Sequence, residues 1–443
     1  MQAFPIHQSP AATAESALQR LVTAYIAAGL LFMLLPGTFL GVWNLIFISN
    51  RHALGRLSPA WLQAHGHAQI FGWIGTFIIG IGYYSLSKMG RVMPFAVSRG
   101  WASWILWICG VTLRWACNIT EWHWQVLMPL SAALQLAGFL IFFVTVSRHK
   151  PRESAMGGTP AAVRPAMETW MKLVIASTAC LLAALLMNQG EAIYVAMYAA
   201  HPELPHWLDQ RYLVLAAWGF PVLAVWGFNA RWLPVFLGLR APSASGLAIA
   251  LAACLGGIGS ALCGKFGLAT ALLLIASIAA AVSLRAFEPA LKPAKTLGVH
   301  GSFPLFVRGA YVWLLIAAGL GVFAAQADTA GGIWGASRHA LTVGFLATMV
   351  FAIGQRVLPA FCGMRVLYSG RLMFASLSLL NAGCFLRVAS EVPAYEGYLA
   401  AAWSVLPVSA IVELTAVSLF ALNLGVTLVL PPPVRAWEQS RRD

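Results

Sequence analysis

The chain has 443 residues, of which 60% are hydrophobic and only 9% are charged, and its formal net charge is +14. A soluble domain has about a quarter charged residues, so this composition excludes a soluble protein and indicates an integral membrane protein. The positive charge does not indicate a nucleic-acid partner, because the basic residues gather in particular loops between apolar runs, as membrane topology requires.

Apolar runs of about 20 residues, the length that crosses a hydrocarbon core of roughly 30 Å, recur along the whole chain. They predict an all-α integral membrane protein with twelve transmembrane helices. The runs lie at 19–48, 62–86, 101–118, 125–147, 171–200, 212–235, 245–264, 266–285, 309–326, 335–358, 372–390 and 399–429. We accordingly divide the chain into a disordered N-terminus at 1–18, a transmembrane domain at 19–429 and a tail at 430–443.

Lysine and arginine are concentrated in the loops that follow the even-numbered helices, and the other loops hold few of them. Because basic loops stay in the cytoplasm, we predict that both termini are cytoplasmic. Residues 1–18 lack the pattern of a cleavable signal peptide. The first helix is therefore expected to act as the insertion signal.

Two histidines, His65 and His67, stand at the start of the second apolar run. Successive helical residues turn by about 100°, so these two side chains point to opposite sides and cannot both face one cofactor. Within a membrane, a histidine either binds a ligand or hydrogen-bonds to a neighbouring helix. For a single histidine the sequence leaves these alternatives open.

A polar loop follows the fifth predicted helix. It holds His201, Glu203, His206 and Asp209 within nine residues. Imidazole and carboxylate groups at this density can bind a metal ion, although the two prolines in the same loop also fit an ordinary polar turn.

His339 in the tenth predicted helix belongs to an internal repeat. The segment from His67 to Leu86 recurs 272 positions later with seven of twenty residues identical, and a third copy, 231–238, matches 356–363 at a spacing of 125, with Val214 at the histidine position. The spacing predicts three repeats of four helices each, at about 19–147, 171–285 and 309–429.

Two histidines at matched depth on different helices are what a heme held from both faces needs, with one imidazole on each axial position of the iron. This predicts His67 and His339 as the heme ligands. Arg338 lies at the same depth and either pairs with a heme propionate or anchors its helix at the lipid interface. Glu413 is expected to be the only acid deep within a span, where it either handles protons or is a hydrogen-bonded structural residue.

The layout and the tenth-helix sequence resemble heme-copper oxidase subunit I. His339-x4-Gly344, with Pro359, Phe361 and Gly363 downstream, is similar to the tenth helix of that family, where one histidine binds the low-spin heme with a partner on the second helix. By this resemblance His339 and His67 form the low-spin pair. The oxidase dioxygen site is not expected, because the chain has Ser337 at the high-spin ligand position and Phe220-Pro-Val222 in place of the copper-binding His-Pro-Glu.

Three motifs more specifically resemble the NnrS family, heme- and copper-containing membrane proteins of the nitric oxide response. They are His65-Gly-His67-Ala-Gln-Ile-Phe-Gly72-Trp, Arg231-Trp-Leu-Pro234-Val-Phe236, and His339-Ala-Leu-Thr-Val-Gly344 with Arg356 downstream. The resemblance implies a heme b, copper as a second metal, and cofactor-binding roles for Arg231 and Arg356, which join His67, His339 and Arg338 as the predicted cofactor-binding residues.

We therefore expect a multi-pass protein of the bacterial inner membrane that binds heme and acts in the response to nitric oxide. Its expected partners are the lipid bilayer, nitric oxide and a respiratory electron donor. His65, which faces away from His67, is the expected ligand of a second metal, together with outer-loop histidines such as His123, His201 or His206. The alternative function is a secondary transporter of a small molecule, which also suits twelve helices with few charges.

Overall fold

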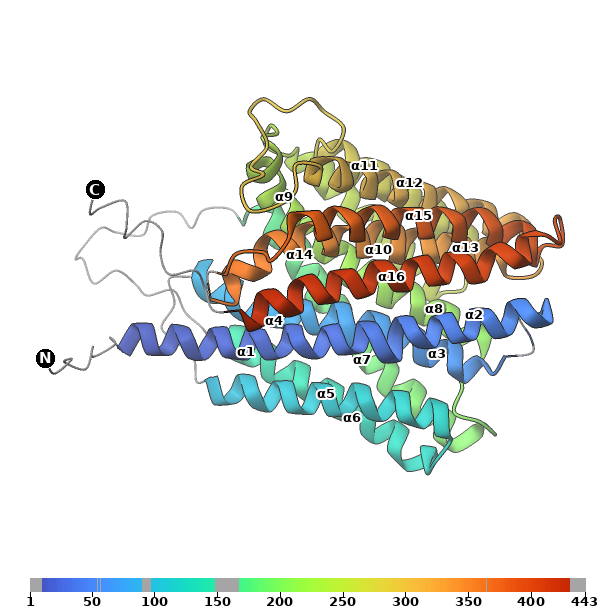
Figure 1. Ribbon diagram of the computed structural model, residues 1–443. Coiled ribbons are helices and arrows are strands. Elements are labelled where there is room, and N and C mark those ends of the chain that lie inside the picture. Colours follow the sequence, from blue (N-terminus) through green and yellow to red (C-terminus); the bar gives the residue numbers. More distant parts are fainter. Residues whose placement is uncertain are drawn as a thin grey trace, which may run out of the picture.

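The computed structural model describes residues 10–53, 55, 57–89, 97–147, 167–363 and 365–430. In these ranges the chain is helical and contains no strand, which confirms the predicted all-α class. Figure 1 shows the long helices lying side by side, with the beginning of α1 and the end of α16 at the same end of the bundle.

The described residues form twelve long helices, several of which join α-helical and π-helical segments. In chain order they are α1 (Pro10–Phe32) with η1 (Met33–Phe39) and α2 (Leu40–Arg51); α3 (Pro59–His67) with η3 (Ala68–Gly75) and α4 (Thr76–Met89); α5 (Val97–Thr120); α6 (Trp124–Ser147); α7 (Thr169–Tyr198); α8 (His206–Val214) with η4 (Leu215–Val222) and α9 (Leu223–Leu237); α10 (Ala244–Leu262); α11 (Phe266–Ser283); α12 (Phe303–Ala327); α13 (Gly332–His339) with η5 (Ala340–Ala347) and α14 (Thr348–Phe361); α15 (Gly370–Tyr395); and α16 (Ala402–Val429).

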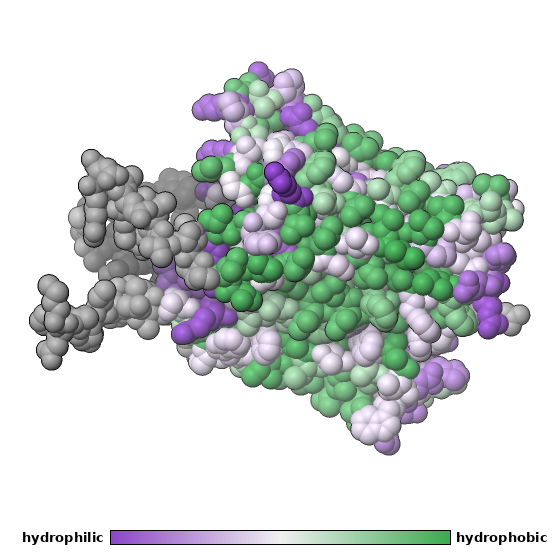
Figure 2. All heavy atoms as spheres, in the orientation of Figure 1, coloured by the Kyte–Doolittle hydropathy of each residue, from purple (hydrophilic) through white to green (hydrophobic). Residues whose placement is uncertain are grey.

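The surface of the bundle fits a bilayer. Ten of the twelve long helices in the described ranges are long and apolar enough to cross a membrane by length and composition, and the other two, α3–η3–α4 and α5, belong to the same bundle. Figure 2 shows hydrophobic residues over the middle of the molecule and hydrophilic ones gathered toward its two ends. Helices satisfy their own backbone hydrogen bonds, as a lipid environment demands, so the chain is a multi-pass membrane protein.

The N-terminal helix begins earlier than expected. Helix α1 starts at Pro10, whereas disorder was predicted for all of 1–18. Proline suits the first turn of a helix, and the alanine, glutamate and leucine residues that follow favour helix. Residues 1–9, the 148–166 loop and the tail from 431 onward lie outside the described residues.

The backbone repeats in the register predicted from the sequence. The π-helical segments η3, η4 and η5 begin at residues 68, 215 and 340. Each begins directly after one of the three aligned positions, His67, Val214 and His339. Single π-helical turns within α-helices often mark functional sites. The three segments therefore indicate a functional role for the positions directly before them, two of which are histidines.

Small residues bring the helices of the first repeat close together. A Cβ added at Gly110 of α5 would lie 2.8 Å from the Ser131 carbonyl oxygen on α6, and one added at Gly138 of α6 would lie 2.9 Å from the Trp107 backbone nitrogen on α5. Close backbone contact at small residues is a common way to pack membrane helices. It holds α5 and α6 as a pair beside the histidine-bearing helix α3.

Candidate cofactor site

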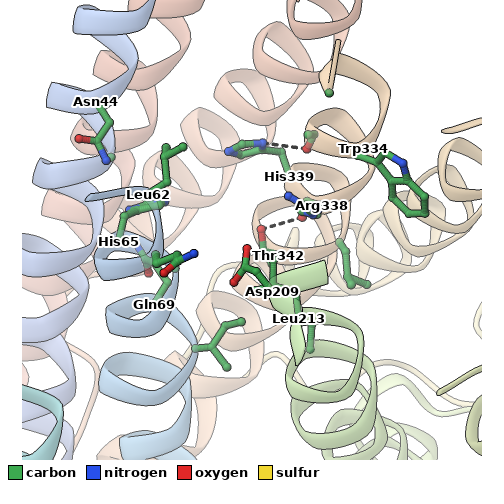
Figure 3. A pocket seen from close by; sticks show the side chains of 18 of the residues that line it. Asn44, Leu62, His65, Gln69, Asp209, Leu213, Trp334, Arg338, His339 and Thr342 are labelled. Atoms are coloured by element: carbon green, nitrogen blue, oxygen red, sulfur yellow. Dashed lines mark hydrogen bonds between the residues drawn. The ribbon is translucent and has the colours of Figure 1, made fainter. Parts of the chain in front are cut away.

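A cavity of about 1040 Å³ lies within the bundle. Its walls come from η1, α2, α3, η3, α5, α8, η4, α11, α13, η5, α15 and α16, and it reaches the α2–α3, α7–α8 and α12–α13 loops at one end of the bundle. Figure 3 shows His65, Gln69, Leu62 and Asn44 on one side and His339, Arg338 and Trp334 on the other. The cavity is at the upper end of the size range of small-molecule and cofactor sites.

One ring nitrogen of His65 is anchored by the backbone. Its Nδ1 lies 2.9 Å from the carbonyl oxygen of Gly37, so Nδ1 donates and Nε2 keeps its lone pair. Helix α2 allows the ring to lie here only because residue 41 is glycine: a Cβ at Gly41 would be 2.6 Å from the ring carbon Cε1. A histidine whose second nitrogen is held by a hydrogen-bond acceptor is the usual arrangement of a metal ligand.

His339 is held in the same way on the facing wall. Its Nδ1 lies 2.9 Å from the carbonyl oxygen of Gly335 and 3.0 Å from Oε2 of Glu391. Both contacts use Nδ1, so Nε2 is the nitrogen that keeps a lone pair for a ligand. The side chain is 26% exposed although it lies inside the bundle, because it borders the cavity.

His67 points in a different direction. Its Nε2 lies 2.9 Å from Oε1 of Gln135 on α6, and its ring stacks on Phe71 with the centroids 4.7 Å apart. The predicted divergence of His65 and His67 is therefore present in the fold. His65 and His67 both line the cavity, and the close view places His65 on the wall opposite His339 (Figure 3).

The two aligned histidines, His67 and His339, contact different neighbouring helices. His67 turns toward α6, in the pair of helices that follows it in the chain, and His339 turns toward α15, in the pair that follows it. The two side chains therefore have different polar partners, although both line the same cavity. The alignment of the repeats identified the helices that carry these histidines. It could not show which of His65 and His67 lies opposite His339.

Two buried acids were missed in the sequence. Glu391 on α15 and Glu191 on α7 are 2% and 3% exposed, whereas Glu413 was expected to be the only deep acid. Glu391 lies just past the predicted end of its helix at 390, whereas Glu191 lies within the predicted run 171–200; helices α15 and α7 position both acids inside the bundle. Glu413 also lines the cavity.

A second polar group surrounds His67. Arg114 is 2% exposed, and it donates from Nε to Asn118 Oδ1 at 3.0 Å and from a terminal nitrogen to Asn188 Oδ1 at 3.3 Å. Within the described residues, both carboxylate oxygens of Glu191 and the hydroxyl of Tyr212 are buried without a hydrogen-bond partner. Buried polar atoms of this kind commonly bind ordered water.

The three predicted cofactor-binding arginines lie in different places. Arg338 lines the cavity and interacts electrostatically with Asp209 of α8. Arg231 pairs with Glu168 at 3.8 Å, and Arg356 donates to the Leu297 carbonyl oxygen at 3.1 Å. Neither Arg231 nor Arg356 lines the cavity, and Arg356 follows His339 by 17 residues, which is ~25 Å of helix.

The outer-loop histidines do not form a cluster with His65 in the part of the chain that the structure describes. His201 Nδ1 contacts Glu121 Oε2 at 3.1 Å, and this hydrogen bond, together with the charge of Glu121, raises the pKa of His201. Across the described residues, no group of three or more His, Cys, Asp or Glu side chains has the spacing of a metal site. Copper stays a prediction without an assigned set of ligands.

Comparison with known proteins identifies the fold but no activity. The profile of a family described as "Domain of unknown function (DUF8744)" matches residues 151–424. No curated protein matches the chain. Among solved structures, the chain is similar to that of a cryo-EM study of a heme-copper terminal oxidase dimer, with 15% sequence identity and a TM-score of 0.71 over 95% of this chain and 85% of that one. This likeness confirms the predicted oxidase-like fold.

Proposed function

Starting from the premise that this chain belongs to the DUF8744 family, whose profile matches more than half of it, we propose that it is a heme-binding membrane protein. The observation that carries the proposal is the pair His65 and His339 on opposite walls of one cavity. Each ring has Nδ1 anchored and Nε2 left for a ligand.

The residues present fit a heme. The cavity has the volume of a cofactor site, His65 and His339 reach it from different helices, and Gly41 leaves room for one imidazole ring. Arg338 on the cavity wall supplies a positive charge that suits a propionate. Heme iron supplies reversible one-electron transfer when it is bound.

This proposal exchanges the roles that the sequence predicted for His65 and His67. His65 and His339 would hold the heme, and His67 would remain in its hydrogen bond with Gln135. A heme ligated on both faces binds a gas only when one histidine leaves, so storage or transfer of electrons suits the site better than gas chemistry at that iron. The proposed inner-membrane location and the link to nitric oxide rest on the basic loops and the NnrS-like motifs.

The test is a reduced-minus-oxidised absorption spectrum of the purified protein and of three alanine variants. We expect a low-spin b-type spectrum that is lost in His65→Ala and His339→Ala and retained in His67→Ala, which is the matched control from the same helix. Loss in His67→Ala with retention in His65→Ala would restore the pair predicted from sequence. A colourless wild-type protein made with ample heme would contradict the proposal and favour a transporter.

A further inference from the structure

Glu391 lies directly behind His339. Its Oε2 is 3.0 Å from Nδ1 of His339 and 3.2 Å from Nε of Arg387, one helical turn earlier on α15. A terminal nitrogen of Arg387 donates to Oε1 at 3.2 Å. The carbonyl oxygen of Gly335 is the better-aligned acceptor for His339, so the carboxylate acts on the imidazole mainly through its charge.

The chain makes room for this carboxylate. A Cβ at Gly335, one turn before His339, would lie 2.2 Å from Oε1 of Glu391. Any larger residue at position 335 would push the carboxylate away from the imidazole. Glycine destabilises a helix interior relative to alanine, so its presence here is explained by the space that Glu391 needs.

The stability of the fold does not by itself explain why the buried ion pair of Glu391 and Arg387 is present. Both side chains are buried, and a buried ion pair can often be replaced by packed apolar residues without loss of stability. The position of Glu391 behind the imidazole of His339 explains the presence of the pair better. A carboxylate beside the outer nitrogen of an imidazole fixes the tautomer and makes the other nitrogen a stronger electron donor, while Arg387 keeps the carboxylate charged.

We propose that Glu391, held by Arg387, is a positioning residue for His339 that stabilises the oxidised state of a heme bound there. The inference rests on the proposed function. It assigns to the third repeat a charged group that acts through the imidazole without touching the cofactor.

The experiment compares Glu391→Gln with Glu191→Gln, the same substitution at a buried acid of α7 that does not line the cavity. Heme content is measured by pyridine hemochrome, the reduction equilibrium by spectroelectrochemical titration, and the ligand field by electron paramagnetic resonance of the oxidised protein. In Glu391→Gln we expect heme to be retained and the equilibrium constant for reduction to rise roughly tenfold, because the negative charge that favours the oxidised heme through the imidazole is removed. The g values should shift as well, and Glu191→Gln should show neither change.

Heme-loaded Glu391→Gln with an unchanged reduction equilibrium and unchanged g values would overturn the inference. If that variant does not accumulate in membranes, Glu391→Asp is tested instead. Its side chain keeps the negative charge but is shorter by one methylene group, so the charge lies farther from His339. We expect the reduction equilibrium to shift in the same direction by a smaller amount, and an unchanged equilibrium would overturn the inference. A wild-type protein without heme would instead remove the proposed function.

Discussion

At the scale of single residues, Gly41 decides where the ring of His65 can lie. A methyl group at this position would be 2.8 Å from Nδ1, the nitrogen that donates to the Gly37 carbonyl oxygen. The ring would have to turn and lose that hydrogen bond. Residues that orient a ligand in this way contribute to cofactor affinity without touching the cofactor.

Gly41→Ala is therefore expected to weaken heme retention about 10- to 100-fold, the usual cost of losing a hydrogen bond behind a ligating histidine. The rate of heme transfer from the purified variant to an excess of a heme-scavenging protein measures the effect. Gly259→Ala on α10 is the matched control, because a Cβ at Gly259 meets no atom within 4 Å and the residue does not line the cavity. Equal transfer rates in the two variants would argue against a role for the ring position.

At the scale of elements, Glu396 at the end of α15 fixes the start of α13. Its carboxylate accepts hydrogen bonds from the hydroxyl of Thr329 at 2.5 Å and from the backbone N–H of Gly332 at 3.1 Å. Partial burial tends to raise the pKa of Glu396, but these hydrogen bonds and those from the backbone N–H groups of Thr329 and Ala330 outweigh it, so the pKa lies below its usual value.

We expect Glu396→Gln to lower the free energy of unfolding at neutral pH by on the order of 1 kcal/mol, as for loss of a helix cap. Because the folded pKa is depressed, the contribution is complete above the unfolded pKa of about 4.3 and is lost as the pH falls through the folded pKa. Thermal melts of wild type and variant should thus differ at pH 7 and converge at more acidic pH. A difference that does not depend on pH would contradict this.

The sequence predicted the helices well and the site only in part. Long apolar runs are a strong signal, because a bilayer fixes their length, and the alignment of His67, Val214 and His339 agrees with where η3, η4 and η5 begin. The direction in which a histidine points depends on how the repeats are rotated around one another, which a linear alignment does not contain. Glu391 was missed because it lies close to the end of an apolar run, where an acid usually marks the interface.

At the scale of the whole molecule, the distribution of basic residues predicts that both termini lie in the cytoplasm. The fold agrees with an even number of crossings, because α1 begins and α16 ends at the same end of the bundle (Figure 1). Green fluorescent protein fused at either terminus should fluoresce, whereas alkaline phosphatase fused there should be inactive. Active phosphatase at either terminus would reverse the proposed orientation.

The cavity lies nearer to one end of the bundle, beside the α2–α3 and α12–α13 loops. His339 lies seven residues after the start of the helix Gly332–Phe361, which is ~10 Å of a helix ~45 Å long. A charge that reaches the cavity from the adjacent loops therefore crosses about a quarter of the transmembrane electric potential, worth ~0.6 kcal/mol per elementary charge per 100 mV. Electron exchange at this site from the loop end would depend on about a quarter of the membrane voltage, whereas exchange from the opposite end would depend on about three quarters of it.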